Sequence, residues 1–130
     1  MENKIIIPHH ISKTFIQSHP EYIFVYGKDF YEMGMMGQMW VAHKEPNCFG
    51  IPTCTKLCPS NKQYLNDHDP LHKQRIIDAL CVIPDDDRPV IVMRRIGMGC
   101  SRMFELAPAL YAFMNKELDK MRHHNIEVVT

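Results

Sequence analysis

The chain has 130 residues, and this length predicts that residues 1–130 form a single domain. It carries 15 basic and 15 acidic residues, and this balance argues against a general nucleic-acid or membrane-surface binder. No apolar run reaches membrane-spanning length, and the apolar stretch near Met1 is too short for a signal peptide. We therefore expect a soluble, cytoplasmic protein whose five cysteines stay reduced.

The first third of the chain predicts two strands separated by a short helix. Residues 4–7 are mostly β-branched, and Pro8 ends this first strand. Ser12 can cap a helix over residues 13–18, which His19 and Pro20 stop because the residue before a proline avoids helical angles. Residues 23–26 are an apolar run that Gly27 interrupts, which is typical of a buried strand.

A turn rich in glycine is expected after this buried strand. Glycines at the beginning of a helix leave backbone amides open to an anion, commonly a phosphate. The spacing is neither that of GxGxxG nor that of a P-loop, so an ordinary β-turn-α connection is the alternative interpretation. The candidate ligand-binding residues in this part of the chain are Gly27, Lys28, Asp29, Gly34, Gly37 and Gln38.

The middle of the chain predicts a second central strand over residues 48–51, closed by Pro52 and Thr53. Thr53 would then lie at the carboxyl end of a strand, where ligands of open α/β sheets collect. Residues 54–70 are more polar and predict a long loop, after which Asp69 and Pro70 start a helix over residues 71–82.

The last third predicts an acidic turn over residues 84–89, a third buried strand over 90–93 and a second glycine loop. A helix from about residue 107 to 123 and a terminal strand over 126–129 follow. The ligand-binding candidates in the second glycine loop are Arg95, Gly97, Met98, Gly99 and Cys100.

Apolar strands that alternate with helices predict an α/β fold of three layers, in which a mainly parallel sheet of about five strands has helices on both faces. The carboxyl ends of its three central strands would lie at one edge of the sheet. The sequence therefore predicts a ligand cleft there, between Gly27–Asp29, Thr53 and the loop from Arg95 to Gly99.

Two sets of potential metal ligands are also present. Cys54, Cys58, His68 and His72 superficially resemble a zinc set, but two prolines interrupt it and we favour solvated or packed side chains. The pairs His9-His10 and His123-His124 are expected on the surface, where they could bind a metal only if the termini meet. We expect no metal and no cofactor.

The order of several motifs resembles that of small uncharacterised domains of bacteria and their phages, over about residues 22–120. The patterns FVYGDN, GxGGQA, EPNAFGIPT and IGTG of those domains correspond here to residues 24–29, 34–38, 45–53 and 96–99. The resemblance implies a Rossmann-like or macro-like fold, because the family is distantly similar to macro and nucleotide-sensing domains that bind ADP-ribose or related nucleotides.

The chain departs from that pattern at several positions. Lys28 and Asp29 stand where the family has Asp and Asn, Met36 replaces a glycine and Met98 replaces a threonine. These departures suggest that the chain keeps binding and lacks turnover if its relatives are enzymes. Lys28, Arg94 and Arg95 could each face a phosphate.

Three hypotheses for the function follow. The first is a protein that binds a nucleotide or ADP-ribose-type ligand, and that in a phage would sequester a host immune signal inside the host cytoplasm. The second is a hydrolase of such ligands, with Asp29 as the base, although no catalytic residue can be assigned and enzymatic activity stays open. The third is an interaction module whose methionine-rich surface buries a partner or a second copy, as a homo-oligomer.

Overall fold

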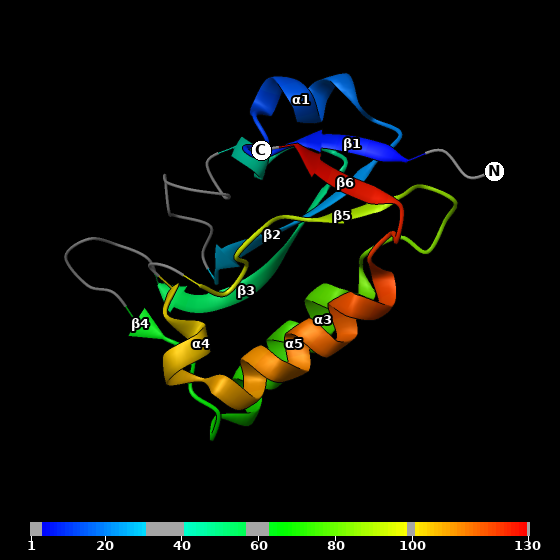
Figure 1. The fold of residues 1–130 in the computed structure, drawn as a ribbon. Coiled ribbons are helices and arrows are strands. Elements are labelled where there is room, and N and C mark those ends of the chain that lie inside the picture. Colours follow the sequence, from blue (N-terminus) through cyan, green and yellow to red (C-terminus); the bar gives the residue numbers. More distant parts are fainter. Residues whose placement is uncertain (1–3, 31–40, 57–62, 99–100, 130) are drawn as a thin grey trace.

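The computed structural model describes residues 4–30, 41–56, 63–98 and 101–129 of the chain (Figure 1). The strands are β1 (Ile5–Pro8), β2 (Ile23–Asp29), β3 (Cys48–Lys56), β4 (Gln63–Tyr64), β5 (Val90–Val92) and β6 (Ile126–Val129). The helices with both ends described are α1 (Lys13–Ser18), α3 (Pro70–Cys81), α4 (Met103–Leu106) and α5 (Pro108–Met121). In these ranges no helix has the length and apolar character needed to cross a membrane.

The strands form two separate sheets. The larger one has the order β4-β3-β2-β5, in which β2 pairs in parallel with both β3 and β5, while β4 runs antiparallel to β3. The smaller one pairs β1 with β6 in parallel. The mixed α/β class and the mainly parallel pairing are confirmed, but the prediction of one sheet of about five strands is wrong, because the two terminal strands pair with each other.

The central strand β2 is buried on both faces, which explains its nearly continuous apolar sequence. Ile23 and Val25 pack with the buried residues of α3 and α5, whereas Phe24 and Tyr26 pack on the opposite side with α1 and the β1–β6 sheet. This alternation is the two-residue period of a strand. Figure 1 shows α3 and α5 together below the sheet, and α1, β1 and β6 above it.

The starts of the two predicted capped helices are confirmed. The Ser12 side chain accepts a hydrogen bond of 3.0 Å from the Phe15 amide at the start of α1. The Asp69 carboxylate accepts one of 2.9 Å from the Leu71 amide, and Pro70 occupies the first turn of α3. Each cap satisfies an amide that has no partner inside the helix.

Two predicted strand ends are wrong. β2 does not end before Gly27 but continues to Asp29, and β3 does not close at Pro52 but continues to Lys56. Gly27 pairs with Ile51 and Lys28 with Pro52, before the register shifts at Asp29. Pairing between neighbouring strands thus outweighs the local turn preference of glycine and proline, and part of the predicted loop over residues 54–70 is strand.

Candidate functional site

Gly27 near the end of β2, Thr53 in β3 and the turn after β5 lie next to one another in the structure. A Cβ atom on Gly27 would lie 3.2 Å from Cγ2 of Thr53 and 3.5 Å from Cγ1 of Ile96, so β2, β3 and the turn after β5 are in contact. Side chains pack this junction, since Asp29 is fully buried and Thr53 is 4% exposed. The Thr53 hydroxyl donates a long hydrogen bond of 3.5 Å to the carbonyl oxygen of Lys28.

The other candidates from the sequence lie in different surroundings. The half-buried Lys28 crosses Gly50, because a Cβ atom on that glycine would lie 2.6 Å from Cδ of Lys28. Gly97 is buried and Met98 is half-buried, whereas Arg95 is exposed. The remaining candidates lie outside the described residues, namely Gly34, Gly37, Gln38, Gly99 and Cys100.

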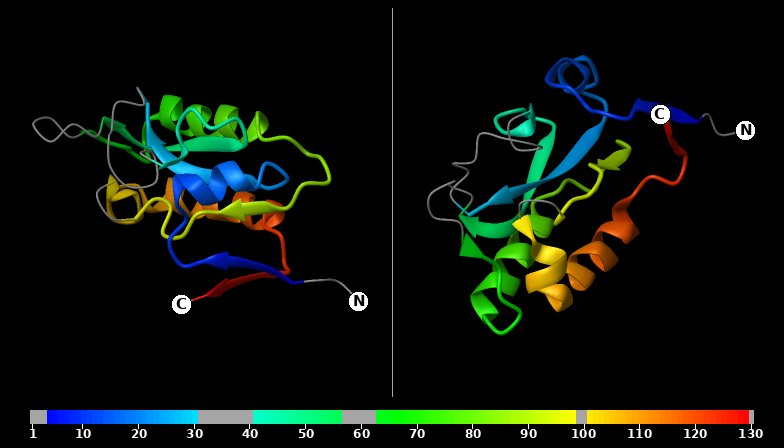
Figure 2. Two further views of the ribbon diagram at one scale, coloured as in Figure 1. Left: turned by 90° about the horizontal axis from the view of Figure 1, so that it is seen from above. Right: turned by 60° about the vertical axis from the view of Figure 1, so that its left-hand side comes forward.

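A cavity of about 850 Å³ lies between β5, at the edge of the larger sheet, and the β1–β6 sheet. We call it the β5 groove; residues 7–12, 41, 90–95, 122, 123, 126 and 128 line it. Figure 2 shows β1 and β6 beside β5, beyond the edge of the larger sheet. Its walls are largely apolar, and Ile7 from β1 and Ile126 and Val128 from β6 belong to the same apolar cluster as Met93 after β5.

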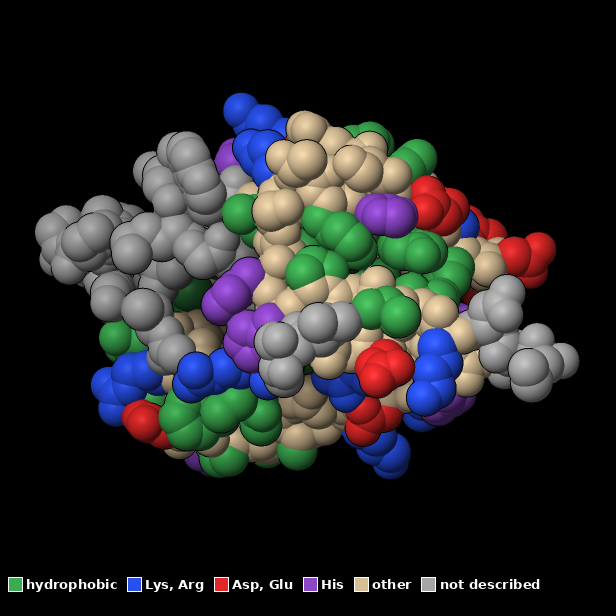
Figure 3. Space-filling model, turned by 45° about the horizontal axis from the view of Figure 1, so that its top comes forward, with side chains coloured by type: hydrophobic (Ala, Val, Ile, Leu, Met, Phe, Trp, Pro, Cys, Tyr) green, Lys and Arg blue, Asp and Glu red, His purple; other side chains and the backbone are tan. Residues whose placement is uncertain are grey.

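Arginine and histidine make up most of the polar lining of the β5 groove. Although the chain has equal numbers of acidic and basic residues, the described part of this lining contains no Asp or Glu. Figure 3 shows histidine side chains next to Lys and Arg side chains on this side of the molecule. The arginines and histidines in the lining are His9, His10, Arg94, Arg95, Arg122 and His123.

One end of the groove holds four of these arginines and histidines, namely His9, His10, Arg94 and Arg95. Arg94 and Arg95 follow β5 directly and are exposed, and Arg95 has a left-handed φ of 59°. The Arg94 guanidinium donates to Nδ1 of His9, whose ring meets that of His10 edge-on at 4.6 Å between centroids. The charge of Arg94, followed by desolvation and the charge of His10, lowers the pKa of His9 below its usual 6.5. His9 is therefore neutral at pH 7 in the free protein.

The free edge of β5 forms the floor of the groove. The Ile23 amide donates to the Pro89 carbonyl at 2.9 Å, and the Met93 amide donates to the Val25 carbonyl at 2.8 Å. Alternate residues of a parallel strand bond to the same neighbour, so the backbone groups of Val90 and Val92 point away from β2. The Val90 carbonyl accepts a hydrogen bond of 3.2 Å from the His123 amide, which ties the end of α5 to the start of β5.

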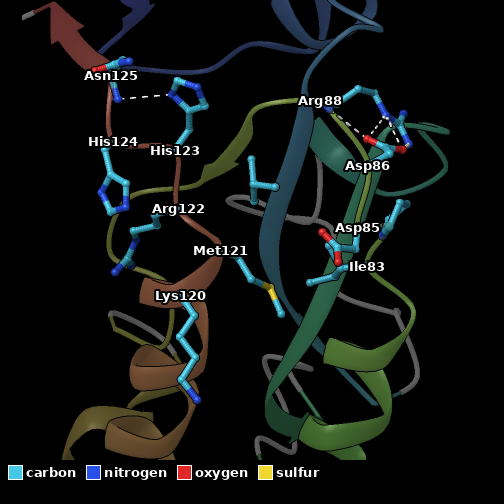
Figure 4. Close-up of a pocket in the computed structure, with 12 residues that line it drawn as sticks. Ile83, Asp85, Asp86, Arg88, Lys120, Met121, Arg122, His123, His124 and Asn125 are labelled. Atoms are coloured by element: carbon cyan, nitrogen blue, oxygen red, sulfur yellow. Dashed lines mark hydrogen bonds and ion pairs between the residues drawn. The ribbon is translucent and has the colours of Figure 1, made fainter.

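A second cavity, of about 610 Å³, lies at the opposite end of β5 (Figure 4). Ile83 and Met121 point into it from two sides, and Asp86 pairs with Arg88 at 2.9 Å on one wall. The cavity shares Val90, Arg122 and His123 with the β5 groove. Because its lining mixes carboxylates with cations, it suits an anionic ligand less well than the β5 groove does.

The potential metal ligands do not assemble. Both ring nitrogens of His72 have partners, since Nδ1 accepts from the Asn66 amide at 2.9 Å and Nε2 lies 3.3 Å from a carboxylate oxygen of Asp69. Cys58 lies outside the described residues, and within the described ranges no three His, Cys, Asp or Glu side chains are grouped to hold a metal. Burial, followed by the charge of Glu45, raises the pKa of the Cys48 thiol to about 12, so this thiol is not a nucleophile.

Sequence reasoning selected only Arg95 from the lining of the β5 groove as a ligand-binding residue, and it named Arg94 as a possible phosphate contact. The groove brings together residues 7–12, 90–95 and 122–128, which are far apart in the chain. The cationic signal was present as Arg94-Arg95 and as the two histidine pairs, but only the pairing of β1 with β6 places these residues together.

No curated protein and no solved structure matches this chain. A family described as a family of unknown function (DUF7831) matches residues 6–117, which is most of the chain and includes strands β2, β3 and β5. The chain belongs to this family.

Proposed function

We propose that the chain binds a nucleotide or ADP-ribose-type ligand in the β5 groove, with the phosphates against Arg94 and Arg95. The observation that carries the proposal is a large groove whose described lining residues include Arg94 and Arg95 and no Asp or Glu. Arginine binds phosphate strongly because its planar guanidinium can donate two parallel hydrogen bonds. The phosphate end would thus lie at the carboxyl end of β5, where ligands of parallel sheets collect.

The apolar walls suit the uncharged part of such a ligand. A volume of about 850 Å³ lies within the range of pockets that hold small molecules, and Ile126, Val128 and Val92 offer apolar surface for a base. We also infer a Rossmann-like or macro-like relationship for the larger sheet. What supports it is the parallel order β3-β2-β5, with α3 and α5 on one face and α1 on the other.

Binding without turnover fits this groove better than hydrolysis. Among the described residues of the lining no carboxylate is present to act as a base, and Asp29, the base expected from the sequence, is fully buried outside the groove. A protein that binds a nucleotide and releases it intact lowers the free concentration of that nucleotide. In a phage, such a protein would sequester a host immune signalling nucleotide.

Charge removal at Arg95 tests the location of the phosphates. We expect Arg95→Gln to weaken the binding of ADP-ribose about tenfold in calorimetry, because a charge-assisted hydrogen bond to the pyrophosphate is lost. Arg88→Gln is the matched control, since it removes the same charge from the wall of the second cavity and should leave the affinity unchanged.

The following three outcomes would contradict the proposal. Equal losses in both variants, or a loss confined to Arg88→Gln, would place the ligand outside the β5 groove. Absence of heat with ADP-ribose, NAD and AMP would exclude nucleotide binding and favour an interaction module.

The affinity for ADP-ribose is expected to rise severalfold when the pH falls from 7.5 to 5.5. A bound pyrophosphate favours the protonated form of His9, whose pKa Arg94 lowers in the free protein, so binding takes up a proton. The pyrophosphate of ADP-ribose keeps its charge over this range. His9→Gln should therefore reduce this pH dependence. Calorimetry at four pH values measures this, and a flat profile in the unchanged protein would contradict it.

A further inference from the structure

We propose that the free edge of β5 recognises the base of the ligand through the backbone of Val92, which donates from its amide and accepts at its carbonyl. This inference rests on the proposed function and states that the groove recognises the base of the nucleotide. The chemical class it selects is a base with a hydrogen-bond donor next to an acceptor, such as the exocyclic amino group and N1 of adenine.

The backbone geometry leaves Val92 as the available position. The odd-numbered residues from 89 to 93 bond to β2, as the contacts of Pro89 and Met93 show, so Val90 and Val92 face the groove. The Val90 carbonyl already accepts from the His123 amide. Among the backbone contacts of the described residues, none uses the outward amide or carbonyl of Val92.

Val92 is half-buried, and a ligand that covers its amide and carbonyl must satisfy both, because each group would otherwise lose water without gaining a partner. Apolar side chains of Ile126, Val128 and Met93 flank this edge and would exclude water from the two hydrogen bonds. A base that presents only acceptors would leave the Val92 carbonyl unpaired. The groove should therefore discriminate between bases that differ at a single amino group.

The position of the cations agrees with this orientation. Arg94 begins the turn after β5, two residues beyond Val92, so the two Cα atoms are at most about 7 Å apart. That separation leaves room for one sugar between a base at Val92 and a phosphate at Arg94 and Arg95. The His123–Val90 hydrogen bond closes the other end of the groove, so the base has one direction in which to enter.

The test compares two ligands that differ only at the amino group. We expect calorimetry to show that AMP binds about tenfold more tightly than purine riboside 5′-monophosphate, which lacks the exocyclic amino donor. In a second measurement, Val92→Pro removes the outward amide without removing a hydrogen bond to β2, so the fold should be retained at an edge strand. This variant should bind AMP about tenfold more weakly than the unchanged protein does.

The outcomes separate the two proposals. Equal affinity for AMP and the analogue would overturn the base-recognition inference, while nucleotide binding in the groove would stand. Absence of binding for both monophosphates would overturn this inference, and absence of binding for ADP-ribose and NAD as well would overturn the proposed function with it. If Val92→Pro does not fold, as judged by circular dichroism, the comparison of the two ligands with the unchanged protein still decides the question.

Discussion

Replacing Asn47 by alanine should lower the free energy of unfolding by about 3 kcal/mol, although Asn47 does not line the β5 groove. The side chain is 5% exposed, and its Nδ2 atom donates to the carbonyl oxygens of Ile16, His19 and Tyr22 at 3.3, 3.0 and 3.2 Å. These contacts attach the end of α1 and the start of β2 to the turn before β3. Alanine would leave the carbonyls without this donor in a site that water does not reach.

Urea unfolding followed by circular dichroism measures the effect, with an unchanged slope indicating an unchanged extent of unfolding. Asn66→Ala is the matched control, because Asn66 is exposed and its side chain accepts only from the His68 amide at 2.8 Å. We expect this control to cost less than about 1 kcal/mol. Equal costs for the two substitutions would mean that the three Asn47 contacts do not hold α1 in place.

Asn47 also illustrates how far local signals predict this fold. The motif Glu45-Pro46-Asn47 predicts a turn, and the structure has one, closed by the Cys48 amide donating to the Glu45 carbonyl at 3.1 Å. Capping residues likewise identify the starts of α1 and α3, because a cap acts within three residues of itself. The part played by the Asn47 side chain is not visible in the sequence, since its partners lie 25 to 31 residues away.

The errors concern features that depend on pairing between distant segments. Gly27 and Pro52 both favour a strand end locally, yet β2 and β3 continue past them because each strand provides the other with hydrogen-bond partners. The separation of β1 and β6 from the larger sheet could not be predicted from patterning either. Both strands are short segments rich in isoleucine and valine, and such composition does not identify which strand is the neighbour.

The same limit applies to the candidate site. Reasoning from strand ends selected Arg95 as a ligand-binding residue, and the structure places it as an exposed cation after β5. It did not connect Arg95 with His9 or His123, because that connection needs the β1–β6 pairing and the bond from His123 to Val90. A groove between two sheets is a property of their packing, so its cationic lining appears only when the fold is known.

A substitution at Gly97 distinguishes a structural role of the second glycine loop from a role in ligand binding. It has φ = +80°, and a Cβ atom there would lie 3.0 Å from Cδ2 of Tyr111 and 3.1 Å from Cε of Met114. A left-handed conformation costs a residue with a side chain about 1–2 kcal/mol, and the crowding against α5 adds to this. We expect Gly97→Ala to lower the free energy of unfolding by about 3 kcal/mol.

The control for Gly97 is Gly27→Ala, which meets Thr53 at 3.2 Å but has no left-handed φ, so we expect a loss of only about 1 kcal/mol. Calorimetry on both variants, at a temperature where each is folded, should give an unchanged affinity for ADP-ribose, because the β5 groove contains neither glycine. A folded, stable Gly97→Ala protein that no longer binds would assign the ligand to the second glycine loop. Since the backbone strain at Gly97 is independent of any ligand, the loss of stability and the loss of binding can be measured separately, and only the first is expected.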